Sequence, residues 1–373
     1  MRKINLVNYP VGVRSRNIEN INGLSMHILE SGYDELNKPL ILLLHGFPEL
    51  AYSWRKIIKP LSNDGFHVVA PDLRGYGKTT GGNVNYDIDI SEYEISNLIT
   101  DLITLVYALN KTSVHCLIGH DFGSILAGHA ALIRPDIFKS VILMSAPFEG
   151  IAKIERKEET YKTNIHEDLA SLPKPRKHYQ WYYSERYAND DMINCSQGLK
   201  NFLRAYYHVK SADWSKNNPH NLKEWSASEL AKLPGYYIMD HGLNMAQQVN
   251  IDMPSQEEVK SCLWLTNDEL DYYYNTFHKT TFQGGLNYYR CMTNDKIRNK
   301  LKLFSNMRIS VPSMFIAGKS DWGIYQKPGA LENMQINATS NYYGSHFVEG
   351  AGHWVQQEKP EEVLKLFYNF LNT

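Results

Sequence analysis

The chain contains 373 residues, a length that fits one large domain with an insertion, or two domains. Its 39 Lys and Arg residues nearly balance its 40 Asp and Glu residues, so the formal net charge is -1 and no summed field favours a nucleic acid, an anionic membrane or a polyanionic partner. We therefore expect chemistry on a small molecule.

The cysteines argue against a disulfide framework and a zinc site, because all four are widely scattered and form no C-x-x-C pair. Cys116 lies inside a predicted strand and is expected to be a small core residue. The amino-terminal segment lacks the apolar stretch of a signal peptide, and no apolar run approaches the length of a membrane span. We expect a soluble cytoplasmic protein without a metal or another cofactor.

Strand and helix patterns alternate along much of the chain. Residues 4–33 alternate loosely and predict one or two antiparallel strands. Further strand patterns, mostly continuous apolar runs typical of a mostly parallel sheet, span residues 39–44, 66–70, 114–119, 140–145, 311–317 and 345–349. Helices are predicted at residues 53–61, 92–109, 125–132 and 360–371. This order favours right-handed crossovers on a parallel sheet with helices on its faces.

The alternation stops between residues 150 and 308. This segment is rich in Tyr, Trp, Asn and Lys, and it predicts helices and loops without buried strands. We interpret it as a mainly helical cap inserted into an α/β core. The predicted organisation is a first core segment at 1–149, the cap at 150–308 and a second core segment at 309–373.

A strand, a sharp turn and a helix meet around the sequence Gly119-His120-Asp121-Phe122-Gly123. This is a G-x-nucleophile-x-G pattern, the nucleophile elbow of α/β-hydrolases, with aspartate where serine is usual. A carboxylate displaces a leaving group at a saturated carbon and forms an alkyl ester, which implies epoxides or alkyl halides as substrates. Taken alone, the pattern also fits an ordinary strand-to-loop turn.

An alkyl ester on Asp121 needs a base that activates water, and histidine is the usual base near neutral pH. His353 follows a strand, lies between glycines and Trp354, and precedes the last helix. Asp321 occupies the loop after the preceding strand and is our candidate for the acid that orients His353. Nucleophile, acid and base then follow the chain order expected of this fold. Glu149 is the alternative acid, and a turn aspartate with a structural histidine is the alternative interpretation.

Two backbone N–H groups are candidates for an oxyanion hole. The sequence His45-Gly46-Phe47-Pro48-Glu49 follows the first buried strand, at the same edge of the sheet as the elbow. The Phe47 N–H, together with the Phe122 N–H, would stabilise the tetrahedral step of ester hydrolysis. We interpret His45 itself as a residue that fixes this loop.

The motifs in this order resemble those of soluble epoxide hydrolases of the α/β-hydrolase superfamily. The resemblance covers almost the whole chain and rests on HGFPE at 45–49, YSWR at 52–55, PDLRGYG at 71–77, GHDFGS at 119–124, SAPF at 145–148 and GAGHW at 350–354. It implies an α/β-hydrolase fold with a helical cap, and the conversion of an epoxide to a vicinal diol.

The family carries a pair of tyrosine acids in its cap, and two cap motifs of this chain match. Tyr179 lies in HYQWYY, and Tyr289 lies in NYYR, where Tyr288 stands at a position that is usually tryptophan. The resemblance therefore implies that Tyr179 and Tyr289 protonate the epoxide oxygen. Tyr182 and Tyr183 are alternatives to Tyr179 in the alignment of the first motif.

Two other functions are alternatives to epoxide hydrolysis. Dehalogenases use the same aspartate nucleophile, but haloalkane dehalogenases resemble one another in holding the halide with an indole N–H after the nucleophile, where this chain has Phe122. Fluoroacetate dehalogenases carry arginines just past the nucleophile, and residues 122–125 contain none. A non-catalytic, ligand-binding relative would have no reason to keep the complete catalytic set.

The density of aromatic residues in the cap favours a largely apolar epoxide, with water as the second reactant. Our candidate substrate-binding residues are Trp181, Tyr182, Trp322 and Trp354. The sequence leaves the natural substrate and the oligomeric state open.

Overall fold

The computed structural model of the chain describes residues 9–154 and 164–372. Within these residues, the central sheet contains eight strands: β1 (Arg14–Ile21), β2 (Leu24–Ser31), β3 (Leu40–Leu44), β4 (His67–Pro71), β5 (Cys116–His120), β6 (Val141–Met144), β9 (Ser313–Gly318) and β10 (Tyr342–Val348). Their spatial order is β1-β2-β4-β3-β5-β6-β9-β10. The β1–β2 and β2–β4 pairs are antiparallel, and the other neighbours are parallel. The prediction of a mostly parallel sheet with one or two leading antiparallel strands is confirmed, and the number of these strands is two.

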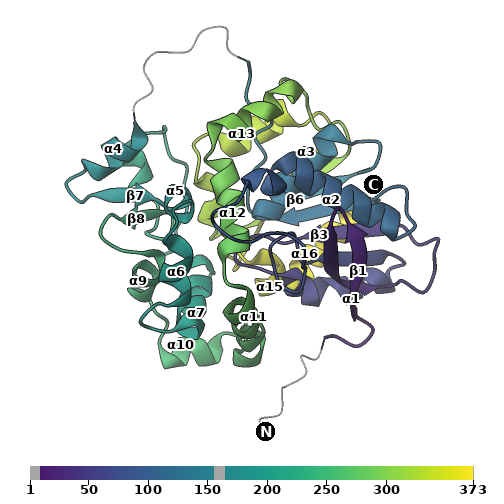
Figure 1. The fold of residues 1–373 in the computed structure, drawn as a ribbon, viewed down its shortest axis with the longest axis horizontal. Helices are drawn as coiled ribbons and strands as arrows, with labels where there is room; N and C mark the ends of the chain where they lie inside the picture. The colour runs from purple at the N-terminus through teal and green to yellow at the C-terminus, as the bar shows by residue number, and fades with distance from the viewer. Residues whose placement is uncertain (1–8, 155–163, 373) are drawn as a thin grey trace.

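Helices cover both faces of this sheet (Figure 1). One face packs against α2 (Ile95–Ala108) and α3 (Phe122–Ile133), and the other packs against α1 (Arg55–Asn63), α15 (Val355–Glu358) and α16 (Pro360–Leu371). Strand β3 shows why its sequence is apolar throughout. Leu42 is buried in the first of these two hydrophobic cores, and its neighbour Ile41 is buried in the second.

A long, mainly helical insertion separates β6 from β9. Its helices are α4 (Ile165–Ala170), α5 (Tyr179–Tyr183), α6 (Ala188–Ile193), α7 (Leu199–Lys210), α8 (Ala227–Leu230), α9 (Met245–Asn250), α10 (Gln256–Ser261), α11 (Asn267–Thr280), α12 (Gln283–Met292) and α13 (Asp295–Lys300). Figure 1 shows most of the insertion to one side of the sheet. The boundaries at 150 and 308 stay a prediction.

The insertion also contains a small antiparallel pair that the sequence pattern missed. Strands β7 (Arg176–His178) and β8 (Ile238–Asp240) pair with each other. Each strand has three residues, which is too short for an alternating pattern to register. Another short helix of the core, α14 (Ala330–Asn333), lies between β9 and β10.

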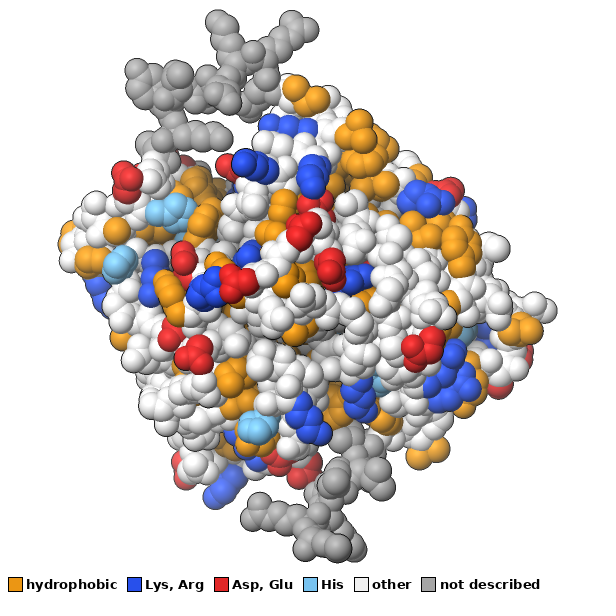
Figure 2. Space-filling model, in the orientation of Figure 1, with side chains coloured by type: hydrophobic (Ala, Val, Ile, Leu, Met, Phe, Trp, Pro, Cys, Tyr) orange, Lys and Arg blue, Asp and Glu red, His pale blue; other side chains and the backbone are white. Residues whose placement is uncertain are grey.

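The surface matches the balanced composition. Figure 2 shows acidic and basic side chains interspersed on the visible face, rather than gathered into a patch of one sign. No helix in residues 9–154 or 164–372 combines the length and the apolar character needed to cross a bilayer.

Candidate active site

The nucleophile elbow is a tight turn between β5 and α3. Asp121 connects the strand to the helix with φ 54° and ψ -118°, a strained backbone conformation for a residue with a side chain. The turn is tight enough to require its two flanking glycines. A Cβ at Gly119 would lie 2.0 Å from the Gly123 carbonyl oxygen, and a Cβ at Gly123 would lie 2.3 Å from the Leu44 carbonyl oxygen.

The two carboxylate oxygens of Asp121 have different neighbours. The Phe47 N–H donates to Oδ1 at 3.0 Å, and His353 Nε2 lies 3.2 Å from Oδ2. Phe122 is the first residue of α3, so its backbone N–H has no hydrogen-bond partner within the helix. The structure therefore brings both predicted oxyanion-hole donors to the elbow, and Oδ2 faces the predicted base.

The pKa of Asp121 reflects this surrounding charge. Burial of Asp121 raises its pKa, but the close contact with the charged His353, together with the charge of Lys210, outweighs burial and holds the pKa below its usual value. Asp121 is therefore ionised at neutral pH, as an attacking carboxylate must be.

Asp321 is the acid that contacts His353. Its two carboxylate oxygens lie 3.1 and 3.2 Å from His353 Nδ1, and both residues are 1% exposed. The Gly323 N–H donates to the same carboxylate at 2.6 Å and fixes it in the turn after β9. The alternative acid, Glu149, forms an ion pair with Lys327 instead.

His353 is charged in this arrangement. Burial lowers its pKa, but the charge of Asp321, its hydrogen bond to His353 and the contact with the Asp121 carboxylate outweigh burial and the opposing charge of Lys210. The pKa therefore rises to about 9. At neutral pH a protonated imidazole thus lies between two carboxylates.

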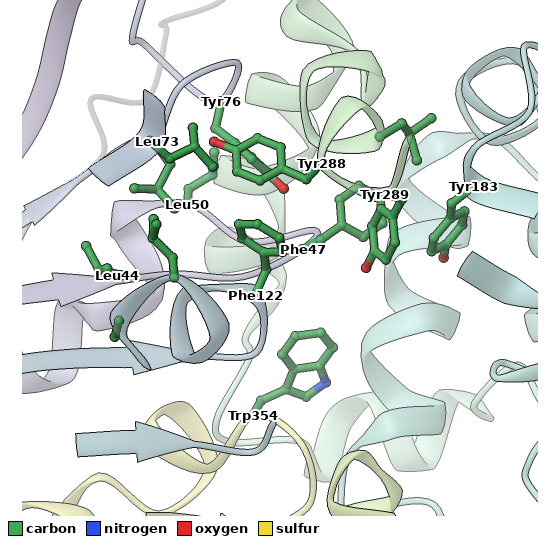
Figure 3. Packing of buried hydrophobic residues seen from close by; sticks show 14 of the residues in the cluster. Leu44, Phe47, Leu50, Leu73, Tyr76, Phe122, Tyr183, Tyr288, Tyr289 and Trp354 are labelled. Atoms are coloured by element: carbon green, nitrogen blue, oxygen red, sulfur yellow. The ribbon is translucent and has the colours of Figure 1, made fainter. Parts of the chain in front are cut away.

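The two predicted tyrosine acids lie together in the cap. The ring centroids of Tyr179, on α5, and Tyr289, on α12, are 5.9 Å apart, and Figure 3 shows Tyr289 beside Phe47 and above Trp354. Burial and the negative charge of Asp121 raise the pKa of both hydroxyl groups well above the usual value. Both hydroxyl groups therefore stay protonated at neutral pH.

The structure separates Tyr179 from its two alternatives in the motif. The Tyr183 hydroxyl donates to another tyrosine, Tyr206, at 3.2 Å, and the Tyr182 hydroxyl donates to Asp191 at 2.9 Å. Asp121 is among the charges that raise the pKa of Tyr179, whereas burial and neighbouring tyrosines raise the pKa of Tyr183. Tyr179 therefore stays the candidate acid of this motif, because its hydroxyl pKa responds to the Asp121 charge.

The four predicted substrate-binding residues have their own contacts. The centroid of the Trp181 ring lies 4.5 Å from that of His166 and 4.9 Å from that of His178. Trp181 therefore contacts other cap residues, as does Tyr182, which donates to Asp191. Trp354 is fully buried beside His353, with its indole N–H bonded to a carbonyl at 2.8 Å. Trp322 is buried next to Asp321, and its indole N–H has no hydrogen-bond partner among the described residues. A role of these residues in binding substrate stays a prediction.

A buried network that no sequence pattern predicted holds the elbow and the His353 loop together. Glu49 Oε2 lies 2.6 Å from His120 Nδ1, and His120 Nε2 lies 2.7 Å from the His353 carbonyl oxygen. Burial raises the pKa of Glu49, but the charge and the hydrogen bond of His120 hold it below the usual value. Glu49 lies in the HGFPE motif and His120 lies in the GHDFGS motif, so their places in these motifs were the signal that could have indicated the contact. His45 fixes its loop as predicted, because its Nε2 accepts the Leu73 N–H at 3.1 Å.

Two further residues contact the site but lie outside the motifs that the sequence analysis recognised. Gln326 Oε1 accepts the Tyr179 hydroxyl at 2.7 Å, and the main chain of Lys210 accepts the His353 N–H at 2.8 Å. These contacts join residues far apart in sequence, and no local pattern predicts them. The described residues contain no group of three or more His, Cys, Asp or Glu side chains placed to hold a metal ion.

Comparisons with known proteins agree with this geometry. The family model described as "alpha/beta hydrolase fold" matches residues 39–360. The chain is 28% identical over 361 residues to epoxide hydrolase A of Mycobacterium tuberculosis, covering 97% of this chain and 98% of that protein. It is also 28% identical to epoxide hydrolase 2 of Siraitia grosvenorii, covering 94% and 96% of the two proteins.

Solved structures give the same result. Epoxide hydrolase I of potato (Solanum tuberosum) is 30% identical with a TM-score of 0.73, covering 96% of this chain and 99% of the potato chain. An epoxide hydrolase from an endophytic Streptomyces is 27% identical with a TM-score of 0.77, covering 97% and 96%. The predicted fold class and resemblance are confirmed. This chain belongs to the α/β-hydrolase fold family and, within it, to the epoxide hydrolases.

Proposed function

We propose that this protein hydrolyses an apolar epoxide to a vicinal diol through a covalent alkyl ester on Asp121. The observation that carries the proposal is the position of the Asp121 carboxylate, with the Phe47 N–H on one oxygen and His353 beside the other. Relatives named epoxide hydrolase support the same reaction. The reactants are the epoxide and water.

In the first half-reaction, Oδ2 of Asp121 attacks an epoxide carbon and the carbon–oxygen bond of the ring breaks. Oδ2 is the attacking atom because Oδ1 is held by a backbone N–H. Tyr289 and Tyr179 donate to the epoxide oxygen, and Tyr179 first releases Gln326. One tyrosine transfers its proton to the alkoxide, which leaves a hydroxyalkyl ester and a tyrosinate.

Ester formation then changes the charge state of His353. Asp121 no longer carries the negative charge that helped to raise the histidine pKa, so this pKa falls. His353 loses its proton, which restores the tyrosine, and the neutral imidazole is able to act as a base. The same residue is thus a cation before alkylation and a base after it.

In the second half-reaction, His353 takes a proton from water, and the resulting hydroxide attacks the ester carbonyl carbon. The N–H groups of Phe47 and Phe122 stabilise the oxyanion that forms at Oδ1. Collapse of the tetrahedral intermediate breaks the Cγ–Oδ2 bond of Asp121, so Oδ2 leaves with the alkyl group. The departing oxygen takes the proton of the hydroxyl group that came from water, which releases the diol and regenerates the Asp121 carboxylate. Asp321 keeps the imidazole oriented throughout.

The test is the intact mass of the His353→Gln variant after incubation with a panel of epoxides and haloalkanes. Without the base, the first half-reaction proceeds while ester hydrolysis stalls, so the covalent ester accumulates. We expect a mass increase equal to one whole epoxide, mapped by peptide analysis to Asp121. The Asp121→Asn variant is the control and should show no increase.

Other outcomes would contradict the proposal. An adduct that has lost a halogen, without any epoxide adduct, would make the protein a dehalogenase. An epoxide adduct on a residue other than Asp121 would refute the nucleophile. Absence of an adduct, together with absence of diol from the wild-type protein across the panel, would favour a non-catalytic relative.

A further inference from the structure

A partly buried carboxylate lies beside the loop that carries His353 and has no role in the mechanism above. Glu358 is the last residue of α15, and its side chain accepts three backbone N–H groups. Its Oε2 accepts those of Ala212 at 2.8 Å and Gly352 at 2.9 Å, and its Oε1 accepts that of Trp354 at 3.0 Å. Because Ala212 belongs to the cap, this one side chain joins the cap to the His353 loop.

Backbone groups, rather than a counter-charge, hold the Glu358 carboxylate. Among the described residues, no basic side chain forms an ion pair with it. Burial, together with the negative charge of Asp213, raises the pKa of Glu358 to about 7, although the three N–H groups oppose the rise. A carboxylate that is removed from water is costly unless it is hydrogen-bonded. The three N–H groups are therefore the partners that stabilise this charge.

The peptide unit that follows His353 is held at both ends. Its N–H, which belongs to Trp354, donates to Glu358 at 3.0 Å. Its carbonyl oxygen, which belongs to His353, lies 2.7 Å from His120 Nε2 and accepts the Ser145 hydroxyl at 3.1 Å. A peptide unit is planar and rigid, so contacts at both ends fix its orientation. This orientation in turn fixes the direction in which the His353 side chain leaves the backbone.

The same carboxylate bridges a close contact between the His353 loop and the cap. A Cβ at Gly352 would lie 2.5 Å from the Ser211 carbonyl carbon and 2.7 Å from the Ala212 nitrogen, so the two backbones touch. Glu358 Oε2 accepts an N–H from each side of this contact. A residue that only capped the start of α15 would need the Trp354 N–H alone. The other two hydrogen bonds therefore point to a role beyond the helix.

We propose that Glu358 is a positioning residue for the base, because its carboxylate clamps the loop around His353 and ties this loop to the cap at Ala212. Asp321 sets the rotation of the imidazole ring, and Glu358 sets the position of the backbone that carries the ring. The inference rests on the proposed function, since it assigns Glu358 to the half-reaction in which His353 activates water. Misplacement of a catalytic group by about 1 Å costs up to about a hundredfold in rate.

The test is a single-turnover experiment on Glu358→Gln with styrene oxide. Glutamine has the same size, but it offers one carbonyl oxygen, and its NH2 group opposes one of the three N–H donors. Rapid quenching followed by intact mass measures the rise and the decay of the ester, at about pH 8, above the pKa of Glu358. We expect ester hydrolysis to slow by about tenfold or more, and ester formation to change by less than about threefold, so that the ester accumulates.

The matched control is Glu349→Gln. Glu349 lies near the same loop, but its carboxylate is exposed and pairs with Lys319. This variant should keep both wild-type rates. Gly352→Ala is a second variant, because its Cβ would push the loop away from the cap, and it should also slow hydrolysis more than ester formation. A wild-type hydrolysis rate in Glu358→Gln would overturn the inference. Equal losses in both half-reactions, together with a lower temperature of unfolding, would show a general structural role instead.

A spectroscopic measurement separates this inference from the proposed reaction. The Nδ1 proton of His353 faces Asp321, with the nitrogen 3.1 Å from the nearer oxygen, and a proton in such a bond has a downfield NMR resonance. In the protein without substrate, Glu358→Gln should shift or broaden this resonance, and Glu349→Gln should not. If the wild-type protein forms no diol but the resonance responds, the positioning role stands and the proposed reaction fails. If diol forms and neither the resonance nor the hydrolysis rate responds, the reaction stands and the positioning role fails.

Discussion

The charge state of His353 gives the sharpest quantitative prediction. Its pKa is raised from the ordinary 6.5 to about 9 by two carboxylates that outweigh burial and Lys210. At about 1.4 kcal/mol per pKa unit, this rise corresponds to about 3 kcal/mol in favour of the protonated form. Because the pKa is higher in the folded protein, the stabilisation is fully present below pH 6.5 and is lost as the pH rises through about 9.

The perturbation is Asp121→Asn, which removes one of the two charges with little change of shape. The charge of Asp321 is the larger favourable contribution, so the Asp121 contribution is less than half of the total. We expect the variant to lower the pKa of His353 by about one unit, or about 1.4 kcal/mol. The same loss of charge accompanies ester formation, so the variant imitates the intermediate.

The assay is an NMR titration of protein with labelled histidine rings, in which His353→Gln assigns the resonance. We expect a midpoint near pH 9 in the wild-type protein and a lower midpoint in Asp121→Asn. Asp136→Asn is the control, because Asp136 belongs to an exposed pair with Arg134. A wild-type midpoint near the ordinary value, or the same midpoint in Asp121→Asn, would refute the switch from cation to base.

Further substitutions test the acids, the elbow and the buried network. Tyr289→Phe should reduce kcat/KM on styrene oxide by about tenfold or more, and the double variant with Tyr179→Phe should reduce it by about a hundredfold or more. Neither variant should change thermal unfolding. Full activity in the double variant would exclude the two tyrosines as acids. Gly123→Ala should lower the free energy of unfolding in urea by about 1–3 kcal/mol, because the new Cβ would lie 2.3 Å from a carbonyl oxygen. Gly242→Ala is the control, because its Cβ would meet no atom within 4 Å, and it should lower the free energy of unfolding by less. Glu49→Ala should cost about 3–5 kcal/mol by the same assay, since it leaves a buried histidine without its partner; a loss below about 1 kcal/mol would show that the pair is not coupled to folding.

Much of the core was determined by local sequence. A strand that is buried on both faces must be apolar at every position, so β3 stands out in the sequence as a continuous apolar run. The elbow is equally local, because the tight turn at Asp121 requires glycine at Gly119 and Gly123. Order along the chain then placed Asp121, Asp321 and His353 at one edge of the sheet. The sequence by itself therefore determined the fold class and, within the candidate triad, Asp121 and His353.

Only the tertiary structure decided among candidate residues that local sequence could not distinguish. Asp321 and Glu149 both follow core strands, and the pairing of Asp321 with His353 is settled by the neighbouring positions of β9 and β10 in the sheet. The tyrosine rings that lie around the Lys210 ammonium are the clearest case, because α5, α7 and the segment before β8 contribute them and none of these segments contains a pattern for the contact. Contacts between distant segments depend on packing, which local periodicity does not encode. The sequence therefore identified the nucleophile, Asp121, whereas only the tertiary structure showed which charged side chains surround it.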